Sequence, residues 1–188
     1  MKLVVGLGNP GQQYSGTRHN VGFDVVRELS ERWQCSKPQL KFNAEICDAM
    51  VRTTRVLLVR PMTYMNKSGE AVQPLMRFFQ IATSDAVVVC DDMNLPQGKI
   101  RWRADGSAGG QKGLENILLR LGTDKIPRLR LGVGRPPGQT DPSGWVLSHF
   151  RPEEREDWQL MIRVAADSVA LWIDSGITSV MNQYNRAN

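Results

Sequence analysis

With 188 residues, the chain has the length of one domain that can bury a hydrophobic core of its own. Its three cysteines are odd in number and lack Cys-x-x-Cys spacing, so they indicate neither a disulfide framework nor a zinc site and fit a reducing cytoplasm. No window of the sequence approaches the roughly 18 apolar residues of a membrane span. The net charge of +5 comes from one segment, because nine Lys or Arg but only three Asp or Glu lie between Lys99 and Arg135.

The first predicted strand, residues 2–7, leads through a turn into a helix that carries a histidine. Gly8, Pro10, Gly11 and Gly16 favour an irregular turn over an immediate helix. Beyond this turn, His19 lies in the first turn of a helix predicted over 18–33, where free N–H groups and the helix dipole favour a neutral ring that can accept a proton. This makes it a candidate general base, with helix capping as the alternative role. The helix is predicted from Thr17 as N-cap and from an apolar stripe of Val21, Val25, Leu29 and Trp33.

The same turn also fits a dinucleotide-binding fingerprint. Gly6, Gly8 and Gly11 match G-x-G-x-x-G after a strand. Residues 12–16 intervene before any helix, however, and residues 27–32 predict helix where the fingerprint requires an acidic strand end about 20 residues on. We therefore discount nicotinamide binding.

The remaining elements alternate between strand and helix. Strands are predicted at 44–51, 55–60, 85–90, 98–103 and 129–134, and helices at 69–80, 110–121 and 153–174. The short connection over residues 52–55 predicts an antiparallel hairpin, whereas helices between the other strands predict parallel crossovers. We expect a single α/β domain over 1–188, with a central mixed, mostly parallel twisted sheet flanked by helices. The Gly- and Pro-rich segment 136–144 is either a flexible gate beside a groove or an ordinary surface connection.

Asp91 follows a buried apolar strand, and α/β sheets place their sites at such strand ends. A carboxylate there can orient an imidazole, with a turn or cap aspartate as the alternative. Asp92 competes for this role, but strand alternation sends the two side chains to opposite sides. The second histidine, His149, lies in an apolar neighbourhood where packing is the expected role.

The basic segment has the charge pattern of a phosphate-binding surface. Lys99, Arg101 and Arg103 alternate with apolar residues, so a strand would place the three cations on one face. This pattern favours a nucleic-acid partner over a merely solvated sheet face.

Four segments stand out along the chain: Gly8 to Asn20, Pro61 to Gly69, Asp91 to Gly98 and Gly109 to Leu114. Together they resemble bacterial peptidyl-tRNA hydrolases, in family order and over nearly the whole chain. The resemblance implies a metal-independent carboxylic-ester hydrolase without a cofactor, which cleaves the bond between a peptide and the 3′ end of tRNA, with His19 as base and Asp91 as its acidic partner. A non-catalytic RNA-binding protein on the same fold is the alternative.

The resemblance also assigns substrate contacts. It implies that Asn9 helps to distinguish peptidyl-tRNA from aminoacyl-tRNA, although turn stabilisation is the usual task of an asparagine beside Pro-Gly. Tyr64 and Met65 offer a stacking surface for the terminal adenine, with core packing as the alternative. Further implied contacts to tRNA or the scissile end are Tyr14 and Asn66, and the phosphate clamp comprises Arg101, Arg103 and Arg130.

The clearest departure from the family pattern is Gln111-Lys112, where relatives usually carry histidine and then a substrate-binding asparagine. Lys112 cannot accept a hydrogen bond, but it can attract phosphate at a helix N-terminus. Gln111 can restore part of the amide function after a small backbone shift. We further expect a cytoplasmic monomer that binds peptidyl-tRNA and requires neither a membrane nor an obligate protein partner.

Overall fold

A seven-stranded sheet forms the centre of the computed structural model, which describes residues 1–136, 138 and 141–186. The strand order is β2-β3-β4-β1-β5-β7-β6. Strands β4, β1, β5 and β7 pair in parallel, whereas the β2–β3, β3–β4 and β6–β7 pairs are antiparallel. The mixed, mostly parallel sheet and the hairpin predicted from the sequence are thus confirmed. The strands are β1 (Lys2–Gly6), β2 (Gln39–Lys41), β3 (Ala44–Val51), β4 (Thr54–Pro61), β5 (Ala86–Asp92), β6 (Ile100–Arg103) and β7 (Arg128–Gly132).

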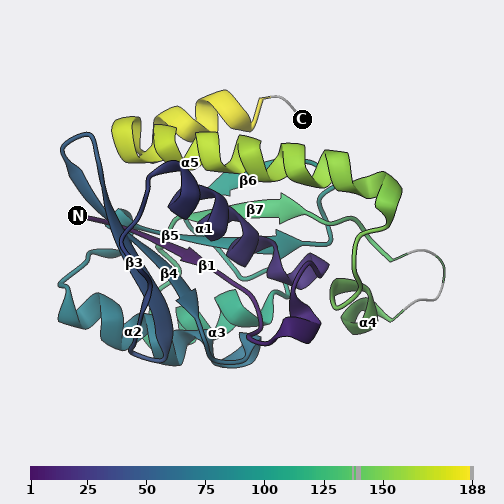
Figure 1. Cartoon of the computed structure of the whole chain (residues 1–188), viewed down its shortest axis with the longest axis horizontal. Coiled ribbons are helices and arrows are strands. Elements are labelled where there is room, and N and C mark those ends of the chain that lie inside the picture. Colours follow the sequence, from purple (N-terminus) through teal and green to yellow (C-terminus); the bar gives the residue numbers. More distant parts are fainter. Residues whose placement is uncertain (137, 139–140, 187–188) are drawn as a thin grey trace.

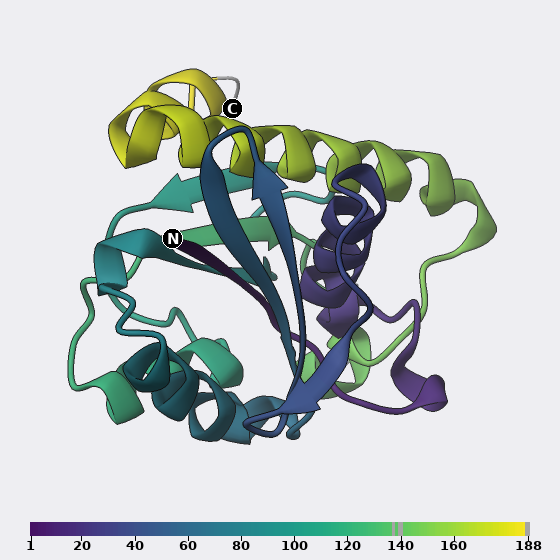
Figure 2. The ribbon, with the colours of Figure 1, turned by 60° about the vertical axis from the view of Figure 1, so that its left-hand side comes forward.

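Helices cover both faces of the sheet (Figures 1 and 2). Helices α1 (Val21–Arg32) and α5 (Arg155–Tyr184) pack on one face, and α2 (Ser68–Phe78) and α3 (Lys112–Leu121) on the other. Alternation along β1 supplies both cores, since Val4 belongs to the first and Leu3 and Val5 to the second. A short helix, α4 (Pro142–Val146), contacts the turn that carries His19.

Helix α1 lies very close to β1 because two glycines face each other. A Cβ on Gly22 would lie 2.3 Å from the Leu7 nitrogen, and a Cβ on Gly6 would lie 2.1 Å from the Gly22 carbonyl oxygen. Real side chains do not tolerate such contacts, so only glycine permits this approach. The residues immediately before α1 are consequently held against the carboxyl end of β1.

The structure corrects several sequence predictions. The expected helix start at residue 18 is wrong, because Arg18–Asn20 form a 3₁₀ turn before α1, and the Thr17 hydroxyl donates to the Tyr14 carbonyl instead of capping the helix. His19 therefore precedes the α-helix. Helix α5 extends to Tyr184 across a kink at Gly176, ten residues beyond the prediction. Strand β2 and helix α4 had no predicted counterpart, and α4 falls partly within the expected loop 136–144, of which residues 137, 139 and 140 lie outside the described residues.

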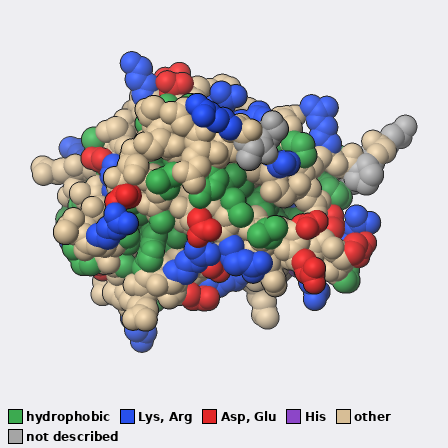
Figure 3. Space-filling model, turned by 90° about the horizontal axis from the view of Figure 1, so that it is seen from above, with side chains coloured by type: hydrophobic (Ala, Val, Ile, Leu, Met, Phe, Trp, Pro, Cys, Tyr) green, Lys and Arg blue, Asp and Glu red, His purple; other side chains and the backbone are tan. Residues whose placement is uncertain are grey.

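The face that carries α5 has mixed charge. Basic and acidic side chains lie beside one another on it (Figure 3), and Arg32 of α1 forms an ion pair with Asp167 of α5 at 2.5 Å. Among the described residues, we find no helix with the length and apolar character needed to cross a membrane.

Candidate active site

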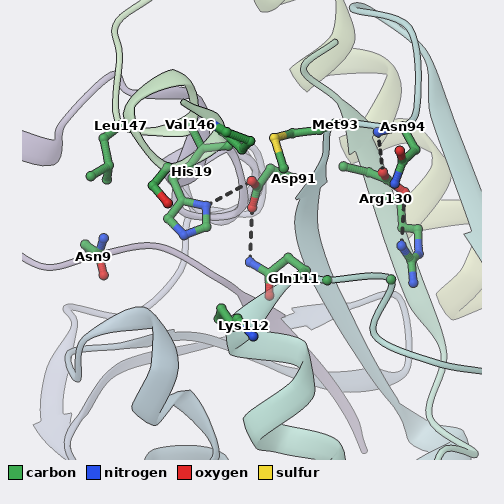
Figure 4. A pocket seen from close by; sticks show the side chains of 15 residues that line it. Asn9, His19, Asp91, Met93, Asn94, Gln111, Lys112, Arg130, Val146 and Leu147 are labelled. Carbon is green, nitrogen blue, oxygen red and sulfur yellow. Dashed lines mark hydrogen bonds and ion pairs between the residues drawn. The ribbon is translucent and has the colours of Figure 1, made fainter. Parts of the chain in front are cut away.

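A cleft of about 340 Å³ lies beyond the carboxyl ends of β1 and β5. After β1, the chain forms β2, β3 and β4 on one side of β1. It then crosses to form β5 on the other side, so the strand order reverses at β1. Such a reversal leaves a crevice in an open α/β sheet, which is the usual ligand site. Its walls come from the β1 turn, the end of β5, the start of α3 and helix α4; they include Asn9, His19, Asp91, Met93, Gln111, Lys112, Arg130, Val146 and Leu147 (Figure 4).

His19 and Asp91 form a hydrogen-bonded pair in this cleft. The His19 Nδ1 lies 2.9 Å from Asp91 Oδ2, with the histidine side chain 14% exposed and the aspartate 4% exposed. Because a carboxylate oxygen only accepts, Nδ1 carries the proton and the lone pair of a neutral ring lies on Nε2. The pair can therefore take a proton from a bound water and stabilise the resulting imidazolium.

The two neighbouring aspartates point in different directions, as strand alternation predicts. Asp91 faces His19, whereas Asp92 accepts from the Asn94 backbone at 2.8 Å and forms an ion pair with Arg130 at 3.0 Å. Strand β5 includes both aspartates and so ends two residues later than predicted. Asp91 alone is thus available to orient the histidine.

Asn9 is fixed so that its amide nitrogen remains unpaired. Its Oδ1 accepts from the Met65 backbone N–H at 2.8 Å. The buried Asn20 side chain accepts from the Asn9 N–H at 2.8 Å and donates to the Asn9 carbonyl at 3.0 Å. Within the described part of the chain, the Nδ2 group of Asn9 has no protein acceptor, and Asn9 lines the cleft. This N–H group can donate to a substrate carbonyl or oxyanion.

Gln111 and Lys112, which depart from the family pattern, occupy different positions in the cleft. Gln111 is buried, and its amide contacts Asp91 and the start of α3 rather than projecting toward a ligand. In this arrangement the amide is not offered to a substrate, and its replacement of the missing amide after a backbone shift stays a prediction. Lys112 is exposed at the rim and pairs with Glu115 at 3.0 Å.

Two arginines of β7 hold the glycine-rich loop before α3. Arg128 is fully buried and donates to the carbonyls of Gly106 and Asp124, the latter at 2.8 Å. Burial, together with nearby Arg130, lowers the pKa of its guanidinium from the ordinary value. Arg130 donates to the Ser107 carbonyl at 2.8 Å. Arg130 is thus largely committed to protein partners, although it lines the cleft.

Arg101 and Arg103 lie on the neighbouring sheet edge. Both belong to β6 and alternate with the buried Trp102, as predicted, and Arg101 is paired in register with Arg130. In the region that the structure describes, neither Arg101 nor Arg103 forms an ion pair. They are therefore better placed than Arg130 to meet an external phosphate.

Other predicted contacts are not brought into the cleft. Tyr14, Tyr64 and Asn66 are absent from its lining, although Tyr64 is 59% exposed. Met65 is 4% exposed because its side chain packs beneath the cleft against α3, so it cannot offer a stacking surface. The predicted packing role of His149 is also wrong, since its side chain is exposed.

Several residues of the site were missed by the sequence analysis. Val146 and Leu147 of the α4 segment, together with Met93, form an apolar wall that no sequence pattern connects with His19. Asn20, which orients Asn9, could have been suspected from its position directly after His19. Buried polar residues that hydrogen-bond to one another, such as Asn9 and Asn20, can be identified only from the folded structure.

Two other kinds of reactive group were sought among the described residues of the site, a thiol of low pKa and a cluster of metal ligands. Burial raises the pKa of the Cys90 thiol, next to Asp91, to about 12, so this group is a poor nucleophile at neutral pH. Among the described residues, no group of three or more His, Cys, Asp and Glu side chains is arranged to hold a metal ion.

Comparison with known proteins agrees with this architecture. A sequence model described as peptidyl-tRNA hydrolase matches residues 3–188. The peptidyl-tRNA hydrolase of Rhodopirellula baltica is 45% identical over 188 residues, covering 100% of this chain and 99% of that protein. That of Syntrophomonas wolfei is 45% identical over 185 residues, covering 98% and 100%. The crystal structure of peptidyl-tRNA hydrolase from Acinetobacter baumannii superimposes with a TM-score of 0.91 at 35% identity, covering 98% of this chain and 94% of that one. The chain therefore belongs to the peptidyl-tRNA hydrolase family.

Proposed function

We propose that this protein hydrolyses the ester bond between a peptide and the 3′ end of tRNA, with His19 as the general base. The observation that carries the proposal is the 2.9 Å contact between His19 Nδ1 and Asp91 Oδ2 in a cleft at the strand reversal. A protein that only bound RNA would not need a base together with the acid that orients it.

The reaction needs few groups because an ester is already activated relative to an amide. His19 Nε2 removes a proton from a water molecule, whose oxygen attacks the ester carbonyl carbon. Asp91 stabilises the imidazolium, and the free N–H of Asn9 donates to the substrate carbonyl as negative charge develops. The imidazolium then returns its proton to the departing ribose oxygen, which releases the peptide and the tRNA. No metal or cofactor is part of this proposal.

Substrate binding is assigned to two surfaces. Arg101 and Arg103, on one face of β6, bind tRNA phosphates, and each neutralised phosphate releases condensed counterions. Lys112 at the N-terminus of α3 provides a further positive charge at the cleft rim. Asn9 helps to distinguish peptidyl-tRNA from aminoacyl-tRNA, because its side chain approaches the scissile carbonyl and the acyl group attached to it. Tyr14, Tyr64 and Asn66 are proposed contacts of the tRNA outside the cleft.

The direct test is release of the acyl group from N-acetyl-aminoacyl-tRNA by the purified protein. We expect hydrolysis by the wild type, little hydrolysis of unblocked aminoacyl-tRNA, and a loss of several orders of magnitude in His19→Ala. The exposed His149→Ala variant is the matched control and should remain active. Tight tRNA binding without release would identify a non-catalytic RNA-binding protein instead.

Because the substrate is a product of translation, we place the protein in the cytoplasm. We also propose that it acts as a monomer, since all residues assigned to the reaction come from one chain. Sedimentation of the protein at working concentration tests the oligomeric state.

A further inference from the structure

Gln111 connects the Asp91 carboxylate with the first turn of α3. Its Nε2 donates to Asp91 Oδ1 at 3.1 Å, while its Oε1 accepts from the Leu114 backbone N–H at 2.7 Å. Figure 4 shows His19 and Gln111 approaching Asp91 from two sides. Each Asp91 oxygen therefore has one side-chain donor, Oδ2 from His19 and Oδ1 from Gln111.

The surrounding groups determine the orientation of the Gln111 amide. A backbone N–H requires the amide oxygen, and a carboxylate requires the amide nitrogen, so both neighbours select the same orientation. The remaining Nε2 hydrogen faces the Met65 sulfur, with a nitrogen–sulfur distance of 3.2 Å. Gln111 is 8% exposed, and both amide groups are engaged with the protein, so it presents no unused donor to a substrate.

The start of α3 also packs closely below the Gln111 amide. A Cβ on Gly113 would lie 2.5 Å from the Met65 sulfur and 3.2 Å from the Gln111 amide oxygen. The glycine thus lets the start of α3 approach Met65 and the amide closely.

Glutamine is an unusual choice for this helix start. The residues preferred as N-caps are Ser, Thr, Asp, Asn and Gly, whose short side chains reach the first-turn N–H groups directly. Gln111 caps α3 with a longer side chain. The additional length is what allows the same amide to reach Asp91 while it caps the helix.

We propose that Gln111 is a positioning residue for hydrolysis, which uses the rigid start of α3 to fix the rotation of the Asp91 carboxylate and thereby the direction of the His19 ring. This inference rests on the function proposed above. Without the Gln111 donor, Oδ1 is left unpaired in a site where Asp91 is 4% exposed, and the carboxylate rotates toward other donors. His19 Nε2 then spends less time in line with the attacking water.

The charged groups near the pair do not duplicate this role. Lys112, next in the chain, is turned outward to Glu115 at 3.0 Å. Arg130 is paired with Asp92 at 3.0 Å, on the other side of β5 from the His19 contact. Among the described residues, only the side chains of His19 and Gln111 form hydrogen bonds to the Asp91 carboxylate.

The test separates positioning from helix capping. In Gln111→Ser, the hydroxyl still accepts from the Leu114 N–H but cannot reach Asp91. In Gln111→Asn, the amide is retained but is shorter by one carbon–carbon bond of about 1.5 Å. We expect both variants to fold, with melting temperatures lowered by a similar few degrees, because Asp91 Oδ1 loses its donor in each of them. Their kcat for N-acetyl-aminoacyl-tRNA should fall about tenfold to a hundredfold with little change in KM, because Gln111 contacts the base pair and not the substrate.

A double-mutant cycle with Asp91→Ala identifies the route of the effect. Once the carboxylate has been removed, adding Gln111→Ser should change kcat by less than about twofold, because residues that act as a unit are not additive. A merely structural role would instead give the same loss in both backgrounds and would overturn the inference.

His19→Ala is measured in parallel to separate this inference from the proposed function. If Gln111→Ser and Gln111→Asn retain wild-type kcat while His19→Ala is inactive, Gln111 is not a positioning residue and the proposed base stands. If His19→Ala remains active, His19 is not the base of the proposed reaction, and the inference about Gln111, which depends on that base, fails too.

Discussion

Replacing Glu154 with glutamine tests the buried ion pair between the His19 turn and the 3₁₀ turn Pro152–Glu154, which directly precedes α5. Arg18, directly before His19, is 1% exposed and donates to both Glu154 oxygens at 3.0 and 2.8 Å. Its guanidinium carbon lies 3.8 Å from the ring centre of Trp145 and 4.5 Å from that of Phe150. The Arg18 backbone N–H also donates to the Ser148 carbonyl at 3.1 Å. One arginine thus joins the catalytic turn to the wall of the cleft.

The magnitude follows from the burial of both partners. Their side chains are 1% and 8% exposed, and removal of one partner of such a pair leaves a buried charge without its counterion. This typically costs about 3–5 kcal/mol, and we expect the lower end because the glutamine oxygen still accepts from Arg18. For a chain of this length, about 3 kcal/mol corresponds to a fall in melting temperature of about 6–12 °C.

The pH dependence has a defined sign. Burial opposes ionisation of Glu154, but hydrogen bonds from the backbone and side chain of Arg151 and the charge of Arg18 together lower its pKa below the ordinary 4.5. A carboxyl group with a lowered folded-state pKa adds stability above its unfolded-state pKa and loses it as pH falls through the folded value. The difference in unfolding free energy between wild type and Glu154→Gln should therefore shrink below about pH 4.5.

Urea unfolding followed by circular dichroism measures these differences. The matched control is Glu153→Gln, because Glu153 is 63% exposed and its ion pair with Arg151 at 3.3 Å should contribute little. The double variant Arg18→Met/Glu154→Leu should recover part of the loss, since it removes both charges. Equal stability of Glu154→Gln and Glu153→Gln at neutral pH would refute the reasoning.

Three further predictions follow from the site and the surface. Asp91→Asn should lower kcat at least about a hundredfold in steady-state assays with KM nearly unchanged, and an unchanged kcat would remove Asp91 from the mechanism. Arg101→Ala should weaken tRNA binding and reduce the slope of log affinity against log salt concentration by about 1. Arg163→Ala on α5 is the control and should change neither the affinity nor the slope. An Arg101→Ala slope equal to that of the wild type would exclude Arg101 as a phosphate contact. Burial raises the pKa of the Cys35 thiol to about 11 and of Cys90 to about 12, so both should react slowly with thiol reagents at neutral pH and rapidly in urea; rapid labelling of the folded protein would contradict this.

Local sequence patterns predicted the elements that are long and regularly apolar. The runs that form β3, β4 and β5 alternate or are fully apolar, and α5 has an apolar stripe that buries Met161, Ala165, Val169 and Trp172. Strand β2 was missed because its three residues are exposed and carry no hydrophobic pattern. Helix α4 was missed because it has five residues within a Pro- and Gly-rich segment.

The sequence by itself determined the α/β class, the strand end that carries Asp91 and the glycine-rich turn that leads to His19, since strand alternation, turn residues and apolar periodicity act over a few residues. Only the tertiary structure decided which groups meet. Asp91 lies 72 positions from His19 and 20 positions from Gln111, and the strand order brings all three to one cleft. The burial of Met65, the commitment of Arg130 to Asp92 and the double use of the Gln111 amide likewise depend on neighbours distant in the chain. A hydrogen bond depends on distance and direction between two groups, and no local pattern encodes either.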